Sequence, residues 1–120
     1  MLKIVVGGQI DKEKVASIAR EVVKDKGKVT VMGDIEAAMA VKTGQADYYL
    51  GACNTGGGGA LAMAIALLGM DKCATVSMPG NIKKDEEIIK EVKLGKKAFG
   101  FTPQHGEIVI PVILNTIING

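Results

Sequence analysis

Short apolar segments alternate with helix-like segments along the whole 120-residue chain, and this alternation restricts the fold more than any other feature. The apolar runs cover residues 2–6, 28–32, 47–52, 73–77 and 98–101. Between the first two runs, apolar residues recur at helical spacing, as in Val15, Ile18, Ala19, Val22 and Val23. We therefore predict a single α/β domain over residues 1–120, a three-layer sandwich with a five-stranded parallel sheet.

Right-handed crossovers leave few possible strand orders for such a sheet. We predict the order 2-1-3-4-5, which is flavodoxin-like or Rossmann-like. Ligands of such sheets bind beyond the carboxyl ends of the strands, where the strand order reverses. In this chain that point lies between the first and third predicted strands. The last segment, residues 107–119, is predicted to be helical, with its start left open because Pro111 disfavours a helix interior.

The segment CNTGGGG, residues 53–59, lies at this reversal point, between a buried strand and a helix. Backbone amides at a helix N-terminus attract anions, and glycines let a ligand come close to the backbone. We expect a phosphate- or carboxylate-bearing metabolite there, bound without metal or cofactor. The expected binding residues are Asn54, Thr55, Gly56, Gly57 and Gly58, with Gly7, Gly8 and Gln9 on the opposite wall. The alternative is that the glycines only let the next helix pack closely on the sheet.

Cys53 is the candidate catalytic residue, because a thiol beside a helix N-terminus becomes more acidic. The alternative is a small buried apolar residue, which is what we expect of Cys73. His105 and Glu107, after the fifth predicted strand, are the candidate partners for proton transfer; an exposed histidine without a role is the alternative. Asp34 is expected to cap a helix.

Composition excludes several classes of function. Aromatic residues make up 3% of the chain and lysines are scattered among acids, which disfavours nucleic-acid binding. No cluster of metal-ligand residues occurs, and the longest apolar run is shorter than the ~20 residues that span a bilayer. Both cysteines lie in apolar segments, which fits the reducing cytoplasm.

The third predicted helix, from Ala60 to Leu68, has no polar face. Such a helix must be buried on every side. We expect a homodimer that covers it, or else a central helix that the chain covers by itself.

The acid-led helix after Asp34, the run GQADYYLGACNTGGGG and the downstream VSMPG closely resemble the YhfU-like family of bacterial proteins. The likeness covers nearly the whole chain. The family has no established activity, so this resemblance implies an identity without a function.

The loop CNTGGG also resembles the C-G-T-G-x-G loop of type B ribose-5-phosphate isomerases. That resemblance implies Cys53 as the base and Gly56 to Gly58 as oxyanion donors. The chain lacks that family's Asp-His pair after the first strand, and its single arginine, Arg20, lies within a helix. Three hypotheses follow: a metabolite-binding protein, an isomerase-type enzyme, and a non-catalytic accessory subunit.

Overall fold

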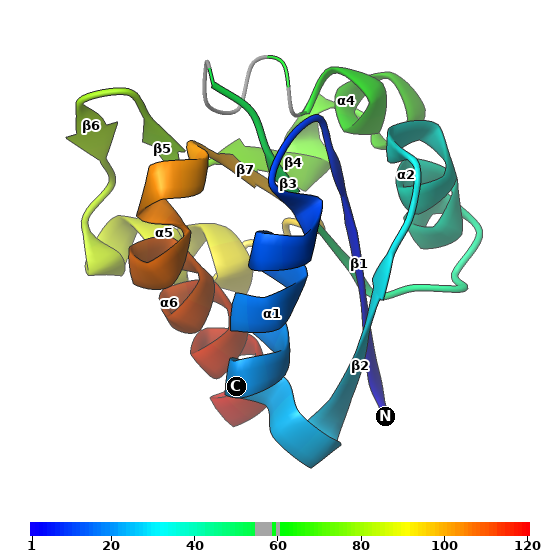
Figure 1. Ribbon diagram of the computed structural model, residues 1–120, viewed down its shortest axis with the longest axis horizontal. Coiled ribbons are helices and arrows are strands. Elements are labelled where there is room, and N and C mark those ends of the chain that lie inside the picture. Colours follow the sequence, from blue (N-terminus) through cyan, green and yellow to red (C-terminus); the bar gives the residue numbers. More distant parts are fainter. Residues whose placement is uncertain (55–58, 60) are drawn as a thin grey trace.

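A computed structural model describes residues 1–54, 59 and 61–120, and shows a parallel sheet between two layers of helices (Figure 1). The sheet has five parallel strands in the order β2-β1-β3-β7-β4. They are β1 (Leu2–Gly8), β2 (Gly27–Val31), β3 (Tyr48–Ala52), β4 (Cys73–Thr75) and β7 (Ala98–Phe101). The predicted three-layer α/β sandwich is confirmed.

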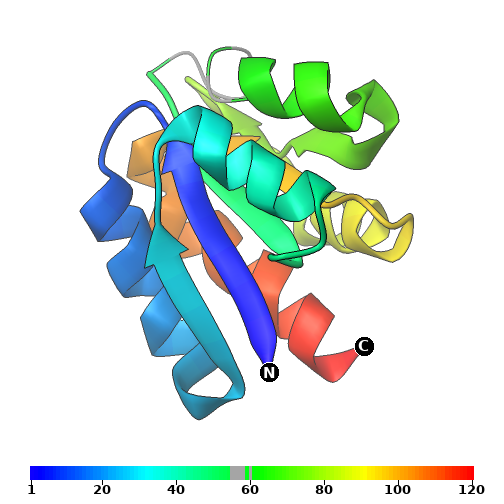
Figure 2. The ribbon, with the colours of Figure 1, turned by 90° about the vertical axis from the view of Figure 1, so that its right-hand side faces the viewer.

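Helices cover both faces of the sheet. One face carries α1 (Lys12–Val23), α5 (Asp85–Lys93) and α6 (Gly106–Asn119), and the other carries α2 (Asp34–Lys42) and α4 (Ala62–Leu68). Short 3-10 turns follow α1, α4 and β7: η1 (Lys24–Lys26), η2 (Met70–Lys72) and η3 (Pro103–His105). Both termini lie at the amino edge of the sheet (Figures 1 and 2).

Alternation along the strands divides the core into two parts, because successive side chains of a strand point to opposite faces. Ile4 and Val6 pack with α1 and α6, whereas Val5 packs with α2. In the same way Leu50 faces the α1 side and Tyr49 the α2 side. Both faces of β1 and β3 are therefore apolar, as the continuous apolar runs indicate.

The predicted order of the last two strands is wrong. In sequence order the five strands stand 2-1-3-5-4, because β7 inserts between β3 and β4. All four residues of β7 are buried and include Phe99 and Phe101, so burial favours a central position for this strand. The three-residue β4 suits the edge. Because β7 lies between β3 and β4, the loop after β7 is next to the end of β3.

Two local features also differ from expectation. The apolar run 73–77 divides into β4 and the hairpin of β5 (Ser77–Met78) and β6 (Asn81–Ile82), whose turn holds Pro79 and Gly80. Gly80 has a φ of 76°, which favours glycine. The last helix, α6, begins at Gly106 and includes Pro111 in its interior.

Helix α4 is covered on one side only. Leu61 and Ala64 are buried, whereas Met63 is 37% exposed. Ala62 and Ala66 are exposed on the same helix. Among the described residues, no helix has the length and apolar character needed to cross a membrane.

Candidate functional site

Four polar side chains stand at neighbouring register positions along the carboxyl edge of the sheet. The pairing of β1, β3 and β7 continues past the strand ends, since Gln9 N donates to Ala52 O at 3.1 Å and Cys53 N donates to Phe101 O at 3.2 Å. At the next position Thr102 N donates to Ser77 Oγ at 3.0 Å. We call these four residues the polar row: Gln9, Cys53, Thr102 and Ser77.

Gln9 connects the loop after β1 with the glycine-rich loop. Its Oε1 lies 3.5 Å from Cys53 Sγ and accepts the thiol hydrogen bond, and its Nε2 donates to Gly59 O at 3.4 Å. The Cys53 side chain is buried at the end of β3. The structure thus brings together Gln9, a predicted binding residue, and Cys53, the candidate catalytic residue.

Thr102 carries a buried hydroxyl group without a hydrogen-bond partner. The residue is 5% exposed, and its Oγ1 makes no hydrogen bond. Successive side chains of a strand alternate between the two faces of the sheet. The side chains of Thr102 and Cys53 therefore both lie on the α2–α4 face, side by side at the ends of adjacent strands. A buried polar atom without a hydrogen-bond partner is costly, so Thr102 Oγ1 is unusual among the buried polar atoms of a folded protein.

His105 is brought to the same edge through η3, where its backbone N donates to Thr102 O at 2.9 Å. Its Nδ1 is also buried without a hydrogen-bond partner. Glu107 is exposed in the first turn of α6. The sequence analysis did not find Thr102, because the predicted strand order placed the loop after β7 at the far edge of the sheet.

The two glycines at the end of β1, Gly7 and Gly8, have packing roles. Gly8 has a φ of 80°, and a Cβ on it would stand 2.7 Å from Ala52 N. Gly7 pairs in register with Gly51, and the Tyr49 ring lies against both, so that a Cβ on Gly7 would meet this ring at 2.5 Å. These glycines let β1, β3 and the Tyr49 ring approach one another closely.

Asp34 fixes this arrangement from the start of α2. Its Oδ1 accepts hydrogen bonds from Gly8 N at 3.0 Å and from the Tyr49 hydroxyl. The predicted capping role is wrong, because Gly33 takes the N-cap position and Asp34 is the first residue of the helix. Burial, followed by the Asp34 carboxylate, raises the pKa of Tyr49 well above its usual range.

The predicted binding residues are only partly described. Asn54 is exposed directly after Cys53. Thr55, Gly56, Gly57 and Gly58 lie outside the described residues. Within the described part of the chain, no three His, Cys, Asp or Glu side chains are grouped to hold a metal ion.

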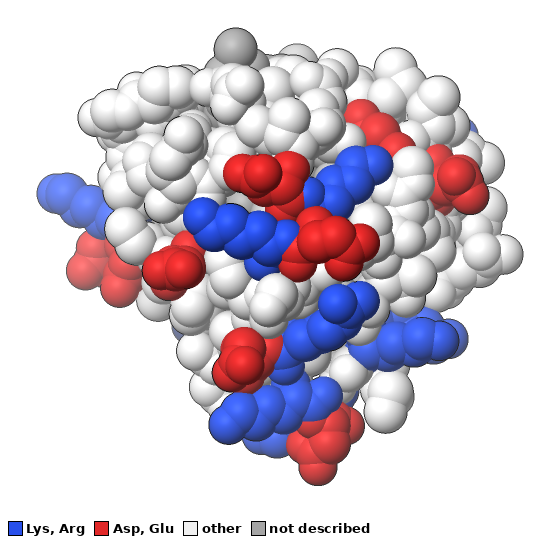
Figure 3. All heavy atoms as spheres, in the orientation of Figure 1, with Lys and Arg blue, Asp and Glu red and all other residues white. Residues whose placement is uncertain are grey.

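Charged side chains gather over the middle and lower parts of the face in Figure 3 and are sparse along its top, where the strands end. The polar row itself consists of uncharged residues. The edge therefore offers hydrogen-bonding dipoles to a ligand.

The whole chain is similar to proteins without an assigned function. Residues 2–117 match the family described as "Protein of unknown function DUF2620". The chain is 47% identical over 109 residues to "Uncharacterized protein YhfU" of Escherichia coli strain K12, which covers 84% of this chain and 93% of the relative. The proteins of the same name from E. coli O6:H1 and Shigella flexneri match equally well. No solved structure matches.

Proposed function

The chain belongs to the DUF2620 family of proteins of unknown function, and we propose that it binds a small anionic metabolite, phosphorylated or carboxylate, at the polar row. This family membership confirms the resemblance to YhfU-like proteins drawn from the sequence.

The buried hydroxyl of Thr102 is the observation that carries the proposal. Leaving such a group unpaired costs about 1–3 kcal/mol, which a ligand oxygen that displaces the atoms covering Oγ1 would recover. The row stands at the carboxyl edge beside the reversal of strand order, where ligands of parallel sheets bind.

The anionic character of the ligand follows from the sequence between Asn54 and Gly59. Consecutive glycines are typical of loops whose backbone a ligand approaches closely, and a helix N-terminus favours negative charge. Polar side chains of the row would hold the uncharged part of the ligand. Amides of residues 54–58, with the Thr55 hydroxyl, would hold its charged oxygens.

Proton transfer by Cys53 is the second candidate function. The observation that favours it is the buried, unpartnered Nδ1 of His105 on the same edge, which supplies a second proton-transfer group. Gln9 Oε1 accepts a hydrogen bond from the Cys53 thiol, and a thiolate acting as a base could not donate this bond. Catalysis of the isomerase type therefore requires the ligand to displace Gln9. A non-catalytic accessory subunit would bind the ligand without this displacement.

A second copy of the chain is our proposed partner for helix α4. Ala62, Met63 and Ala66 leave an exposed apolar surface on α4, which a homodimer would cover. Light scattering should show a dimer that Met63→Glu disrupts and Leu94→Glu, an exposed control, does not. A monomeric wild type would contradict this assembly. Buried cysteines are consistent with a cytoplasmic location.

Calorimetry against a panel of sugar phosphates and carboxylic acids tests the binding function. Gly57→Val and Gly58→Val should abolish binding by steric exclusion, and Thr55→Val should weaken it by about 1–3 kcal/mol. Thr116→Val is the matched control, because this hydroxyl bonds Val112 O within α6. If the panel contains a ligand that the folded Gly→Val variants bind as well as the wild type, the proposal is wrong.

A further inference from the structure

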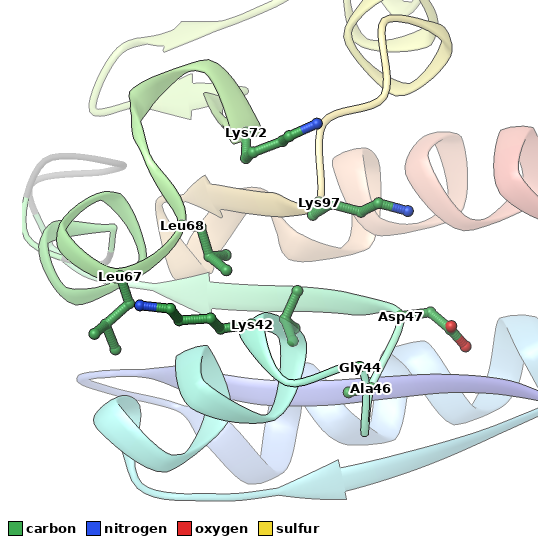
Figure 4. A pocket seen from close by; sticks show the side chains of 9 residues that line it. Lys42, Gly44, Ala46, Asp47, Leu67, Leu68, Lys72 and Lys97 are labelled. Carbon is green, nitrogen blue, oxygen red and sulfur yellow. The ribbon is translucent and has the colours of Figure 1, made fainter.

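A second cavity lies at the amino edge of the sheet, away from the polar row. It measures about 500 Å³ and lies between the ends of α2 and α4 (Figure 4). Its volume falls within the range of about 300–1,000 Å³ that is typical of small-molecule sites.

The cavity combines an apolar wall with basic groups. Val41, Ala46, Leu67 and Leu68 supply the apolar wall. Lys42 extends from the end of α2 toward Leu67, so that its carbon chain continues this wall (Figure 4).

Lys72 and Lys97 form a basic pair at one side of the cavity. Lys97 N donates to Lys72 O at 2.7 Å, which places the two residues at neighbouring positions just before β4 and β7. Their side chains extend in the same direction (Figure 4). Lys97 Nζ also lies 4.9 Å from the centre of the ring of Tyr48, a residue that packs toward the α1–α6 side of the core.

Among the described residues that line the cavity, the basic side chains outnumber the acidic ones. Asp47 is the one acidic residue among the described residues that line the cavity, and its Oδ2 accepts a hydrogen bond from Lys3 N at 2.8 Å. Like charges at neighbouring positions repel each other. An anion between Lys72 and Lys97 would relieve this repulsion.

We infer that this cavity binds an anionic amphiphile, a molecule whose apolar chain or ring ends in a carboxylate or phosphate. The apolar part lies against Leu67 and Leu68, and the anionic group lies between Lys72 and Lys97. The inference is independent of the polar row, because the two sites lie at opposite edges of the sheet.

Amide chemical shifts in ¹⁵N-labelled protein, followed during titration, test this inference with four probes. Octanoate and octyl phosphate carry both features of the ligand, octanol carries the apolar chain alone, and acetate carries the charge alone. We expect the first two probes to shift the amides of residues 41–47, 67–69 and 97, and to bind at least tenfold more tightly than octanol or acetate.

The double variant Lys72→Gln/Lys97→Gln should bind octanoate roughly tenfold more weakly than the wild type. Lys14→Gln/Lys26→Gln makes the same change in net charge at exposed positions on and after α1, and should leave octanoate binding unchanged. Equal octanoate affinity for both double variants, octanol binding as tightly as octanoate, or no response to octanoate at millimolar concentration would each overturn the inference.

Discussion

Replacing Thr102 by valine should stabilise the ligand-free protein while weakening its binding of the anion. Valine has nearly the shape of threonine and suits the extended backbone at this position (φ −79°, ψ 135°), so no cavity forms. The change removes a buried hydroxyl that has no hydrogen-bond partner. Since such a group costs about 1–3 kcal/mol, we expect the free energy of unfolding to rise by about 1–2 kcal/mol.

Urea denaturation at neutral pH measures this change, and thermal unfolding provides a second readout. A gain of about 1 kcal/mol should raise Tm by roughly 3–6 °C for a chain of this size. The control Thr116→Val removes a hydroxyl that donates to Val112 O at 2.7 Å, and should not be stabilising. If Thr102→Val lowers the free energy of unfolding as Thr116→Val does, the hydroxyl has a partner in the free protein and the reasoning fails.

Three further predictions concern the glycines, the buried tyrosine and the two thiols. Gly8→Ala should destabilise the fold by about 2 kcal/mol or more in urea denaturation, because its Cβ would meet backbone atoms of β3 in addition to the strain of a positive φ. Gly44→Ala, with a similar φ of 82° and open space around it, should cost less, and equal losses would refute the role of the close approach. Burial and its carboxylate partner raise the pKa of Tyr49 above the value of about 10 in the unfolded chain, so its contribution to stability is fully present below pH 10 and is lost as the pH rises further. The free energy of unfolding of Tyr49→Phe should therefore fall less between pH 9 and 11 than that of the wild type. Identical slopes against pH for the two proteins would contradict the assignment of this decline to Tyr49. A thiol reagent near neutral pH should modify Cys53 faster than Cys73, because burial raises the pKa of the Cys73 thiol; equal or reversed rates in single Cys→Ser variants would remove the case for a special thiol.

The layered architecture could be predicted because it depends on local patterns. Each parallel strand is buried on both faces and therefore appears as a short apolar run, while the helices show their own spacing. The order of β4 and β7 could not be predicted in this way, since right-handed crossovers permit either arrangement. It depends on how β7, with Phe99 and Phe101, packs beneath helices that are distant in sequence.

The candidate site could be predicted only in part, because local patterns indicate some of its residues and long-range contacts bring in the others. The reversal of strand order lies between β1 and β3, and this local rule placed Gln9 and Cys53 together. Thr102 reaches the site only because β7 takes the central position. Asp34 has the sequence context of a helix cap, yet its partners are Gly8 and Tyr49, from two neighbouring strands. Long-range contacts of this kind leave no periodic signal in the sequence.

A crystal structure of the protein with the tightest-binding anion of the panel tests the central proposal most directly. We expect an oxygen atom of the ligand within about 3.2 Å of Thr102 Oγ1, with its anionic group against the amides of residues 54–58. An anion bound elsewhere, with the Thr102 hydroxyl still without a partner, would contradict the proposal that the polar row is the binding site.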